Sequence, residues 1–345
     1  MRDYTKNIIY KNANSLEALH KLNVEKSSQT LFVLDDNNRL IGTLTDGDIR
    51  RGLIKGLDLN CSVHQFSFKN FMFIENEINV SDIKRLKQDG IKILPKLNSF
   101  GQIEKVYDLT QLNSILPLHA VIMAGGRGER LRPLTDQTPK PMLPLGLKPI
   151  LEHNIDRLIS FGVETITITV RYLAEQIIDY FGDGSSKGIN IDYIKEETPL
   201  GTIGALSLIE DIKQESVLVL NSDIFSNINF EDLFLVFENS NADMAVASIP
   251  YSVDIPYAIM ELEGNTIKSF KEKPKNTYYA NAGIYLIKKQ TVNIIPRGRF
   301  FNATDLMNSI ISNNGRLIHS PITGYWIDIG KHDDYNKAKE IIKHL

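Results

Sequence analysis

From residue 118 onward, apolar segments of strand length alternate with segments that carry helical signals. One such helical segment begins with proline and ends with glycine, as helices often do. The alternation predicts a mixed, mostly parallel α/β sheet with right-handed crossovers and helices on both faces, and such sheets bind ligands at the carboxyl ends of their strands. We expect strands at 118–124, 165–170, 189–196 and 216–225, and helices at 149–162, 173–182 and 202–210.

After residue 240 the expected strands become more frequent. They fall at 243–249, 257–264, 265–273 and 278–289, with short polar connections between them. Consecutive strands joined this closely form antiparallel hairpins. We therefore expect an antiparallel subregion that walls off a pocket beside the parallel sheet.

The composition is that of an ordinary soluble globular protein with two domains. The 345 residues are 42% hydrophobic and 23% charged, and the net charge is −3. A negative chain has no overall attraction for nucleic acid, so no such partner is expected. Cys61 is the single cysteine and has no internal disulfide partner, which fits a reducing compartment. The N-terminus lacks the apolar core of a signal peptide and no apolar run has the length of a membrane span, so a cytoplasmic location is predicted.

The N-terminal third contains one unit that occurs twice. Residues 30–53 have the pattern of a strand, a polar turn, a strand and a helix, and residues 91–112 repeat this order. A helical segment precedes each copy, at 15–23 and at 80–90. Two such units usually bury their apolar faces against each other, so we expect a small α+β domain over 1–115.

This repeated unit resembles a CBS domain, and two of them form a CBS pair. The resemblance covers about residues 3–115 and is most specific in GTLTDGDIRRGL. It implies that Thr45 and Asp48 hold the ribose of an adenine nucleotide, and that the pair regulates activity or forms a homodimer. The alternative is a folded module without a ligand. The second copy, EKVYDLTQL, has no T-x-x-D and predicts no second nucleotide site.

The first strand of the larger region leads into a basic loop, MAGGRGERLRPLTDQTPKPMLPLGLKP. A glycine-rich turn at a strand end can present backbone N–H groups to phosphate. A Walker A loop is excluded because no lysine follows at the required spacing, and a dinucleotide fingerprint is excluded because Leu131 follows Gly126 and Gly128 where a third glycine belongs. What remains is G-G-x-G-x-R-L-x-P-L-T followed by PKPMLP.

That long motif is the signature of sugar-1-phosphate nucleotidylyltransferases, and residues 118–345 resemble this family throughout. The resemblance implies the nucleotide-diphospho-sugar transferase fold and the transfer of a nucleotide from a triphosphate to a sugar phosphate. Several negative charges must then meet, and arginine and lysine suit their binding. The residues implied are Gly125 and Gly126 at the nucleotide, Arg127 or Arg130 as the activating arginine, and Lys140 at the α-phosphate.

The same resemblance implies a divalent cation held by two carboxylates. Asp223 follows the apolar run VLVLNS, and Asp328 lies in GYWIDIG. Mg²⁺ in such enzymes is bound by one or two carboxylates together with phosphate oxygens. The two residues are too far apart in sequence for their spacing to prove a site. We therefore expect Mg²⁺ at Asp223 and Asp328 on the strength of the matching motifs.

A base-binding segment is predicted at KEETPLGTIGAL, which begins at residue 195. Gly201 lets the backbone approach a base closely. Guanine presents two neighbouring donors, which one carboxylate can accept, whereas uracil and thymine present one donor between acceptors. Glu196 or Glu197 therefore favours GTP as the substrate.

The sugar side of the site is implied by a further set of family positions. They place Glu272 at the sugar hydroxyls, Lys273 at the sugar phosphate, and Asn281 and Tyr257 beside the sugar. Relatives usually have glycine after that tyrosine, whereas this chain has Ala258. The identity of the sugar is therefore less well specified than that of the base.

Together these residues predict that GTP and a hexose 1-phosphate form a GDP-sugar and pyrophosphate with Mg²⁺. The fusion with a CBS pair resembles the glucosamine-1-phosphate guanylyltransferases of bacterial legionaminic acid biosynthesis, which make GDP-glucosamine. Mannose 1-phosphate or a heptose phosphate is the rival sugar, and a uridylyl-, thymidylyl- or cytidylyltransferase is the rival enzyme. A nucleotide-sensing CBS protein with an inactive transferase domain is a third hypothesis.

Overall fold

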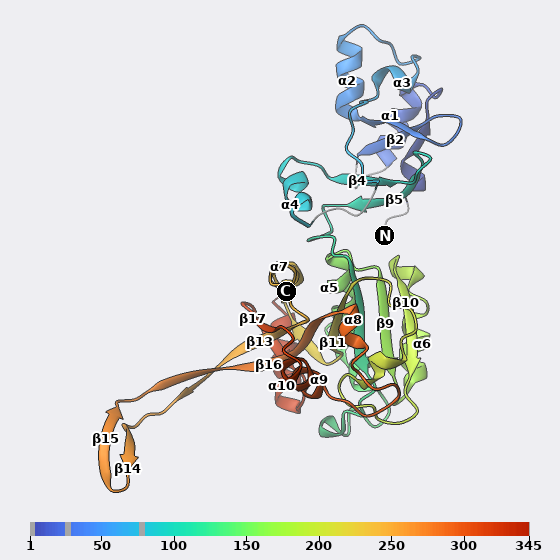
Figure 1. Ribbon diagram of the computed structural model, residues 1–345. Helices are drawn as coiled ribbons and strands as arrows, with labels where there is room; N and C mark the ends of the chain where they lie inside the picture. The colour runs from blue at the N-terminus through green and yellow to red at the C-terminus, as the bar shows by residue number, and fades with distance from the viewer. Residues whose placement is uncertain (1–3, 25–28, 76–79, 345) are drawn as a thin grey trace. The chain divides into compact units, whose positions relative to one another are not determined.

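The computed structural model describes residues 4–24, 29–75 and 80–344 of the chain. They form two compact units (Figure 1). The N-terminal unit comprises Met1–Leu116 with Ile159–Gly162 and Lys187–Ile189, and the larger unit comprises Pro117–Leu158, Val163–Ser186 and Asn190–Leu345.

The N-terminal unit begins with a three-stranded sheet in which β1 runs parallel to β2 and β2 runs antiparallel to β3. The β2–β3 turn forms because Asp35 accepts hydrogen bonds from the backbone N–H groups of Asn37 and Arg39. A separate hairpin, β4–β5, follows. The elements are β1 (Ile8–Tyr10), α1 (Ser15–Val24), β2 (Thr30–Leu34), β3 (Leu40–Thr45), α2 (Asp46–Ile54), α3 (Val63–Phe66), α4 (Val80–Gln88), β4 (Ile93–Leu97) and β5 (Ile103–Asp108).

The second copy of the repeat lacks its final helix in the described part of the chain, so that detail of the predicted order is wrong. Residues 109–117 connect β5 directly to the first strand of the larger unit. Within this short connection, Leu109 and Ile115 are buried in an apolar cluster with Ile83 and Leu94. Leu109 lies in a hydrogen-bonded turn, in which the amide of Gln111 donates to the carbonyl of Asp108, and this turn takes the place of the expected helix.

The larger unit is built on a seven-stranded sheet of order β10-β9-β6-β11-β16-β13-β17. In this sheet only β16 runs antiparallel to its neighbours, and the other adjacent strands run parallel to each other. This confirms the mixed, mostly parallel sheet. Its strands are β6 (Leu118–Ala124), β9 (Thr165–Val170), β10 (Asn190–Lys195), β11 (Ser216–Asn221), β13 (Met244–Asp254), β16 (Lys275–Lys288) and β17 (Leu317–Pro321).

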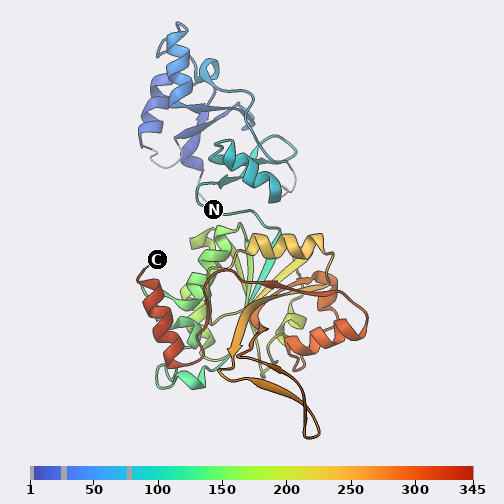
Figure 2. The same ribbon diagram turned by 90° about the vertical axis from the view of Figure 1, so that its left-hand side faces the viewer.

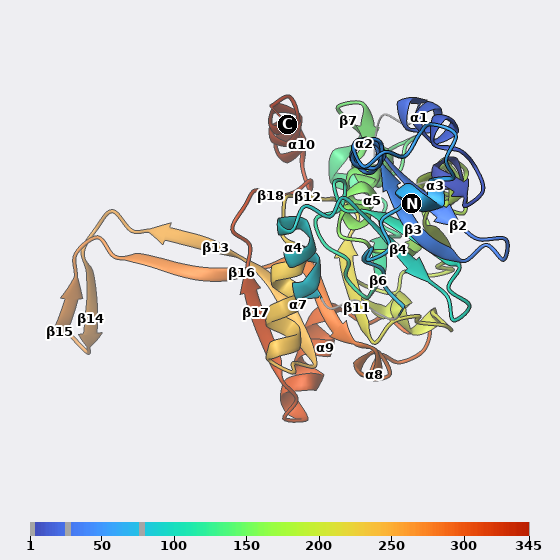
Figure 3. The same cartoon turned by 90° about the horizontal axis from the view of Figure 1, so that it is seen from above.

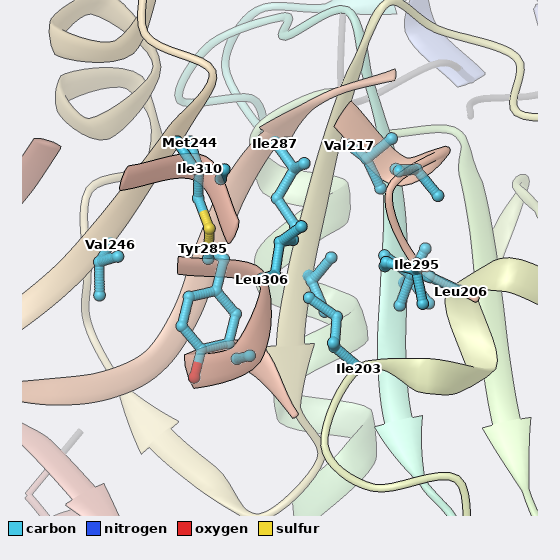
Figure 4. Close-up of a cluster of buried hydrophobic side chains, with 14 of the residues drawn as sticks. Ile203, Leu206, Val217, Met244, Val246, Tyr285, Ile287, Ile295, Leu306 and Ile310 are labelled. Carbon is cyan, nitrogen blue, oxygen red and sulfur yellow. The ribbon is translucent and has the colours of Figure 1, made fainter. Parts of the chain in front are cut away.

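Helices and smaller strands surround this sheet. The helices are α5 (Ile150–Ser160), α6 (Ala174–Phe181), α7 (Phe230–Asn239), α8 (Lys289–Val292), α9 (Ala303–Ser312) and α10 (His332–Ile342). The smaller strands are β7 (Pro144–Leu145), β8 (Lys148–Pro149), β12 (Ile224–Ser226), β14 (Ile259–Glu263), β15 (Thr266–Lys271) and β18 (Trp326–Asp328). The large core on one face of the sheet joins side chains of β11, β13 and β16 to those of α8 and α9 (Figure 4).

Two predicted elements of the larger unit differ in the structure. The helix expected at 202–210 is only a short 3-10 helix, Gly204–Leu208, and the backbone N–H groups of Ile203 and Gly204 at its start donate to the carbonyl of Phe301. The strand expected at 216–225 is interrupted after Asn221, where the chain leaves the sheet. It resumes as β12, which pairs with β18.

Beyond the sheet edge, β13 and β16 continue as a two-stranded ribbon that ends in the β14–β15 hairpin. Figures 1, 2 and 3 show this ribbon leaving the larger unit and reaching away from its sheet. We call residues 251–280 the arm. Every residue of the arm is exposed except Ile255, Pro274 and Ala280, which are partly buried. The predicted antiparallel subregion therefore exists, but it does not close over a pocket of its own chain.

No helix in the described ranges has the length and apolar character that a membrane crossing requires.

The buried His119 makes the stability of the larger unit depend on pH. Burial lowers the pKa of His119 below its ordinary value of 6.5. Its ring contacts Thr167 Oγ1 at 2.8 Å and accepts from the Lys213 amide. Below about pH 6.5 the unfolded chain binds a proton that the native chain does not, so the unfolding free energy should fall, by at most about 1.4 kcal/mol per pH unit for this group.

Urea unfolding between pH 5 and 8 measures this slope. His119→Gln should flatten it, whereas His344→Gln, which changes an exposed histidine, should leave it unchanged. Equal slopes in His119→Gln and in the unmodified protein would contradict the assignment.

Candidate active site

A cavity of about 290 Å³ lies where β6, β9, β10 and β11 end, at the carboxyl edge of the sheet. Parallel strands place their terminal loops together at this edge, so residues distant in sequence share one cavity. The wall combines glycines, carboxylates, cations and a few apolar side chains. It consists of Met123, Gly125, Gly126, Lys140, Pro141, Arg171, Glu196, Pro199, Leu200, Gly201, Thr202, Asn221, Ser222, Asp223 and Phe300.

The glycine-rich loop after β6 forms one side of this cavity. The backbone N–H groups of Gly126 and Arg127 donate no hydrogen bond within the described residues, so they are free to bind an anion. Gly128 has a φ of +62°, and a Cβ there would lie 2.9 Å from the Cβ of Lys140. Glycine at 128 therefore allows both the left-handed turn and the close approach of Lys140.

The basic loop is held in a fixed shape by the body of the larger unit. Leu131 is fully buried in an apolar cluster. Thr135 donates its hydroxyl to the carbonyl of Gly128 at 2.9 Å. The hydroxyl of Tyr172 donates to the carbonyls of Thr135 and Asp136 at 3.0 and 2.9 Å. The loop is therefore an ordered wall of the cavity rather than a solvated tail.

Lys140 lies between Asp223 and Asp328, the two carboxylates that are predicted from the sequence to bind a metal ion. Its Nζ forms an ion pair with Asp223 and lies 4.0 Å from Asp328 Oδ1. Asp223 precedes β12 and Asp328 ends β18, and these strands pair antiparallel with Ile224 opposite Asp328. The amide of Ile329 also donates to the carbonyl of Asp223 at 3.0 Å. This short ladder brings together two residues that lie far apart in the sequence.

The charges in this cluster favour a cation between the carboxylates. Burial raises the pKa of Asp328, the nearby Asp223 carboxylate raises it further, and Lys140 and Arg130 oppose the rise. Within the described residues no three His, Cys, Asp or Glu side chains are grouped to hold a metal. A pair of carboxylates with room for phosphate oxygens is a donor set that fits Mg²⁺.

The two candidate arginines lie beside different residues of the larger unit. Arg127 is exposed, and its guanidinium lies 6.0 Å from the centre of the Tyr172 ring. Arg130 lies on the Asp328 side, where a Cβ at Gly330 would come within 3.4 Å of its Nη2. Neither arginine lines the cavity in the structure.

Of the two adjacent glutamates, only Glu196 faces the cavity. Glu196 is 8% exposed, and its Oε2 accepts from the amide of Leu200 at 3.3 Å. Its Oε1 lies so close to Gly125 that a Cβ there would be 2.6 Å away. Glu197 is exposed and lies outside the wall. The structure therefore places Glu196, and not Glu197, where a bound base could reach it.

Arg171 is a cavity residue that the sequence analysis missed. It directly follows β9, and its Nε is buried without a hydrogen-bond partner among the described residues. A buried unpaired donor in a cavity wall is costly unless a ligand satisfies it. The available signal was its position, because the residue after a buried parallel strand lies at the ligand-binding edge.

Gly201 lines the cavity as expected, but its conformation has a structural cause. Its φ is +80°, and a Cβ would lie 2.6 Å from the carbonyl oxygen of Phe301. The amide of Phe301 donates to the carbonyl of Leu200 at 2.9 Å. Glycine at 201 is therefore required by the neighbouring backbone, whether or not a base also approaches it.

The predicted sugar-side residues are not assembled at the cavity of their own chain. Tyr257, Glu272 and Lys273 lie on the exposed arm. Asn281 lies at the root of the arm, where it donates to the hydroxyl of Tyr285 at 2.9 Å and accepts from the amide of Gly283 at 2.8 Å. The cavity wall therefore contains Asp223 and the residues predicted for the nucleotide, but not Asp328 or the arm residues.

The N-terminal unit has a cavity of its own, of about 430 Å³, whose wall includes Thr45, Gly47 and Lys92. Asp48 is not part of that wall. It forms the capping box of α2 with Thr45, whose hydroxyl donates to Asp48 Oδ2 at 2.6 Å, and it also pairs with Arg51. The structure thus gives Thr45 and Asp48 a helix-capping role.

The chain belongs to the family described as nucleotidyl transferase, which matches residues 119–344. Two curated relatives cover the same region. A mannose-1-phosphate guanylyltransferase of Mycobacterium tuberculosis is 29% identical over 63% of this chain, and the bifunctional protein GlmU of Methanococcus maripaludis is 37% identical over 62%. The matches span 62% and 51% of those proteins, so the chain covers less than two thirds of their length.

Solved structures share the same fold. A chain from Bacillus anthracis, described as a glucose-1-phosphate thymidylyltransferase in complex with a sucrose, aligns with a TM-score of 0.55. HddC from Yersinia pseudotuberculosis, complexed with GMP-PN, aligns with a TM-score of 0.51. Each is 26% identical, and each alignment covers 66% of this chain, with 96% and 100% of the solved chains.

The glycine-rich loop generates a test with a matched control in the same loop. Gly128→Ala should lower the unfolding free energy by about 1–2 kcal/mol, because alanine is strained at positive φ and would crowd Lys140. Gly126→Ala should change it by less than about 0.5 kcal/mol, because among the described residues no atom beyond its chain neighbours lies within 4 Å of the added Cβ. Denaturant titration compares the two, and equal effects would disprove the role given to Gly128.

Proposed function

We propose that the chain is a sugar-1-phosphate nucleotidylyltransferase that converts GTP and a hexose 1-phosphate to a GDP-sugar and pyrophosphate. The observation that carries this proposal is the cluster of Lys140, Asp223 and Asp328 beside the free amides of the glycine-rich loop. It combines anion-binding and cation-binding groups at one mouth, as a reaction between two phosphorylated substrates requires.

Each group in this cluster has a task in the transfer. The free amides of Gly126 and Arg127 bind triphosphate oxygens, and Lys140 binds the α-phosphate. An oxygen of the sugar phosphate attacks the α-phosphorus in line, and the bond from that phosphorus to the β-phosphate oxygen breaks to release pyrophosphate. Asp223 and Asp328 hold Mg²⁺, which supplies neutralisation of the phosphate charge.

The base is proposed to be guanine. One oxygen of Glu196 is engaged by the Leu200 amide, and its remaining acceptor positions can take the N1–H and 2-amino donors. The guanidinium of Arg171 lines the same cavity and carries donors that match the O6 and N7 acceptors of guanine. The guanylyltransferase name of one relative and the GMP-PN complex of another support this base.

The sugar is proposed to be glucosamine 1-phosphate, in bacterial legionaminic acid biosynthesis. Support comes from the joining of a transferase to a CBS-like N-terminal region, which has the β-α-β-β-α order of a CBS domain over β1–α2. The mannose-1-phosphate guanylyltransferase relative makes mannose 1-phosphate the nearest rival. The arm residues that would contact the sugar do not discriminate between these two.

The N-terminal unit is proposed to bind an adenine nucleotide and to pair with a second copy. Its cavity of about 430 Å³ has the size of a small-ligand site, and Lys92 in its wall suits a phosphate. Thr45 and Asp48 both cap α2, but only Thr45 lines this cavity, so the ribose contact is proposed for Thr45 and its neighbours rather than for Asp48.

Turnover of GTP, UTP, dTTP and CTP with glucosamine, mannose and heptose phosphates tests the proposal by pyrophosphate release. GTP should give the highest kcat/KM, EDTA should stop the reaction, and Mg²⁺ should restore it. Glu196→Gln should lower kcat/KM for GTP about 10- to 100-fold, because one charged hydrogen bond is lost.

Glu197→Gln is the matched control and should retain the activity, because Glu197 lies outside the cavity wall. Faster turnover with UTP or dTTP would overturn the guanine assignment. Absence of turnover with every pair would favour the nucleotide-sensing alternative.

Thermal unfolding with AMP, ADP and ATP tests the N-terminal cavity. The proposal expects a rise in the melting temperature, which Lys92→Ala should reduce for ATP. Lys55→Ala, at an exposed position outside the cavity wall, should leave the shift unchanged. A chain whose melting temperature is unaffected by all three nucleotides does not have this site.

A further inference from the structure

The arm carries an apolar surface that its own chain does not cover. Ten of its large apolar side chains are exposed, including Tyr257 at 75%, Phe270 at 69% and Leu262 at 63%. An isolated two-stranded hairpin is only marginally stable in water, and a contiguous exposed apolar surface marks an interaction site. The arm therefore needs a covering surface.

Its own sheet cannot supply that surface without losing hydrogen bonds. The β13–β16 ladder is continuous from Ser248 opposite Asn281 to Asp254 opposite Lys275. Six residues of strand extend about 20 Å, so the β14–β15 hairpin begins roughly that far from the last buried pairs. Folding back over the cavity of the same chain would break this ladder.

Two charged residues of the arm, Glu272 and Lys273, are available to bind a ligand because they do not pair within the arm. The other arm lysines pair within the arm: Lys268 with Glu263, Lys271 with Glu261 and Lys275 with Asp254. Glu272 and Lys273 have no ion pair among the described residues.

The backbone at Lys273 supports the same reading. Its φ is +43° although it precedes Pro274, and residues before proline favour extended backbone. Such strain marks functional positions. A cation without an ion pair among the described residues, on strained backbone between β15 and β16 of an uncovered apolar arm, is suited to a charged site elsewhere.

We propose that the arm docks on the larger unit of a second copy of this chain, and that its Lys273 and Glu272 complete the sugar-phosphate side of that copy's cavity. The inference rests on the proposed function for the role of these two residues. Because each chain has one arm and one incomplete cavity, reciprocal exchange closes a symmetric dimer.

The surfaces on both sides fit this exchange. If each of the ten exposed apolar side chains loses on the order of 100 Å² on docking, one arm buries roughly 1,000 Å², compared with about 800 Å² per partner in a standard interface. On the receiving side, Phe300 in the cavity wall is 62% exposed and offers an apolar contact at the rim.

Co-expression of two differently tagged chains, purified as the heterodimer, tests the exchange. One chain carries Asp223→Asn and the other Lys273→Ala, and each homodimer should be nearly inactive. If the arm acts in trans, the heterodimer has one intact cavity and recovers about half of the unmodified activity. If the arm acts on its own chain, no activity returns, and the proposal is overturned.

Lys268→Ala is the matched control, because this arm lysine pairs with Glu263 and should be dispensable for activity. A heterodimer of Asp223→Asn and Lys268→Ala should be active whether the arm acts on its own chain or on the other chain. Only the pairing with Lys273→Ala distinguishes the two cases.

Amide hydrogen exchange tests the docking without relying on any activity. Residues 256–272 should exchange slowly in the dimer and at least tenfold faster in Phe270→Asp, whereas Ile311→Asp, an exposed apolar residue of α9, should leave them protected. Fast exchange of these amides in the unmodified chain, or protection in a chain that sediments as a monomer, would overturn the proposal even if the enzyme proved to have another substrate.

Discussion

The cluster of Lys140, Asp223 and Asp328 beside the cavity of the larger unit depends on a cation between two carboxylates. Asp223 and Asp328 would repel each other in this partly buried position, and Lys140 offsets that repulsion. The short β12–β18 ladder fixes the spacing of the carboxylates, and Gly128 allows the basic loop to bring Lys140 between them. If the proposed function holds, Lys140 and a divalent cation are alternative counter-charges for these two carboxylates.

The architecture separates the site into a rigid half and a projecting half. The glycine-rich loop, Lys140 and Glu196 are held by buried strands and by an ordered loop. The arm carries Glu272 and Lys273 but has no core of its own. If the arm residues act as proposed, substrate binding depends on the surface that receives the arm, and reciprocal exchange makes the second copy part of the catalytic unit.

Much of the fold could be predicted because its signals are local. The strands at 118–124 and 165–170 have the bounds expected from their apolar runs. The helix expected at 202–210 is only the 3-10 helix Gly204–Leu208, whose first amides donate to the carbonyl of Phe301, a residue far away in the sequence. The choice between Glu196 and Glu197 as the cavity residue also required the structure. Adjacent residues of one segment point in opposite directions, and the sequence does not say which of them faces inward.

The order of the chain by itself determined the alternating α/β architecture, the place of the basic loop after the first strand and the residue types suited to phosphate, because these follow from neighbours close in sequence. Only the tertiary structure decided that Asp223 meets Asp328, that Arg171 enters the cavity and that Lys273 stays away from it. Strand pairing and ribbon direction depend on contacts between residues far apart in the chain, and no local pattern encodes those contacts.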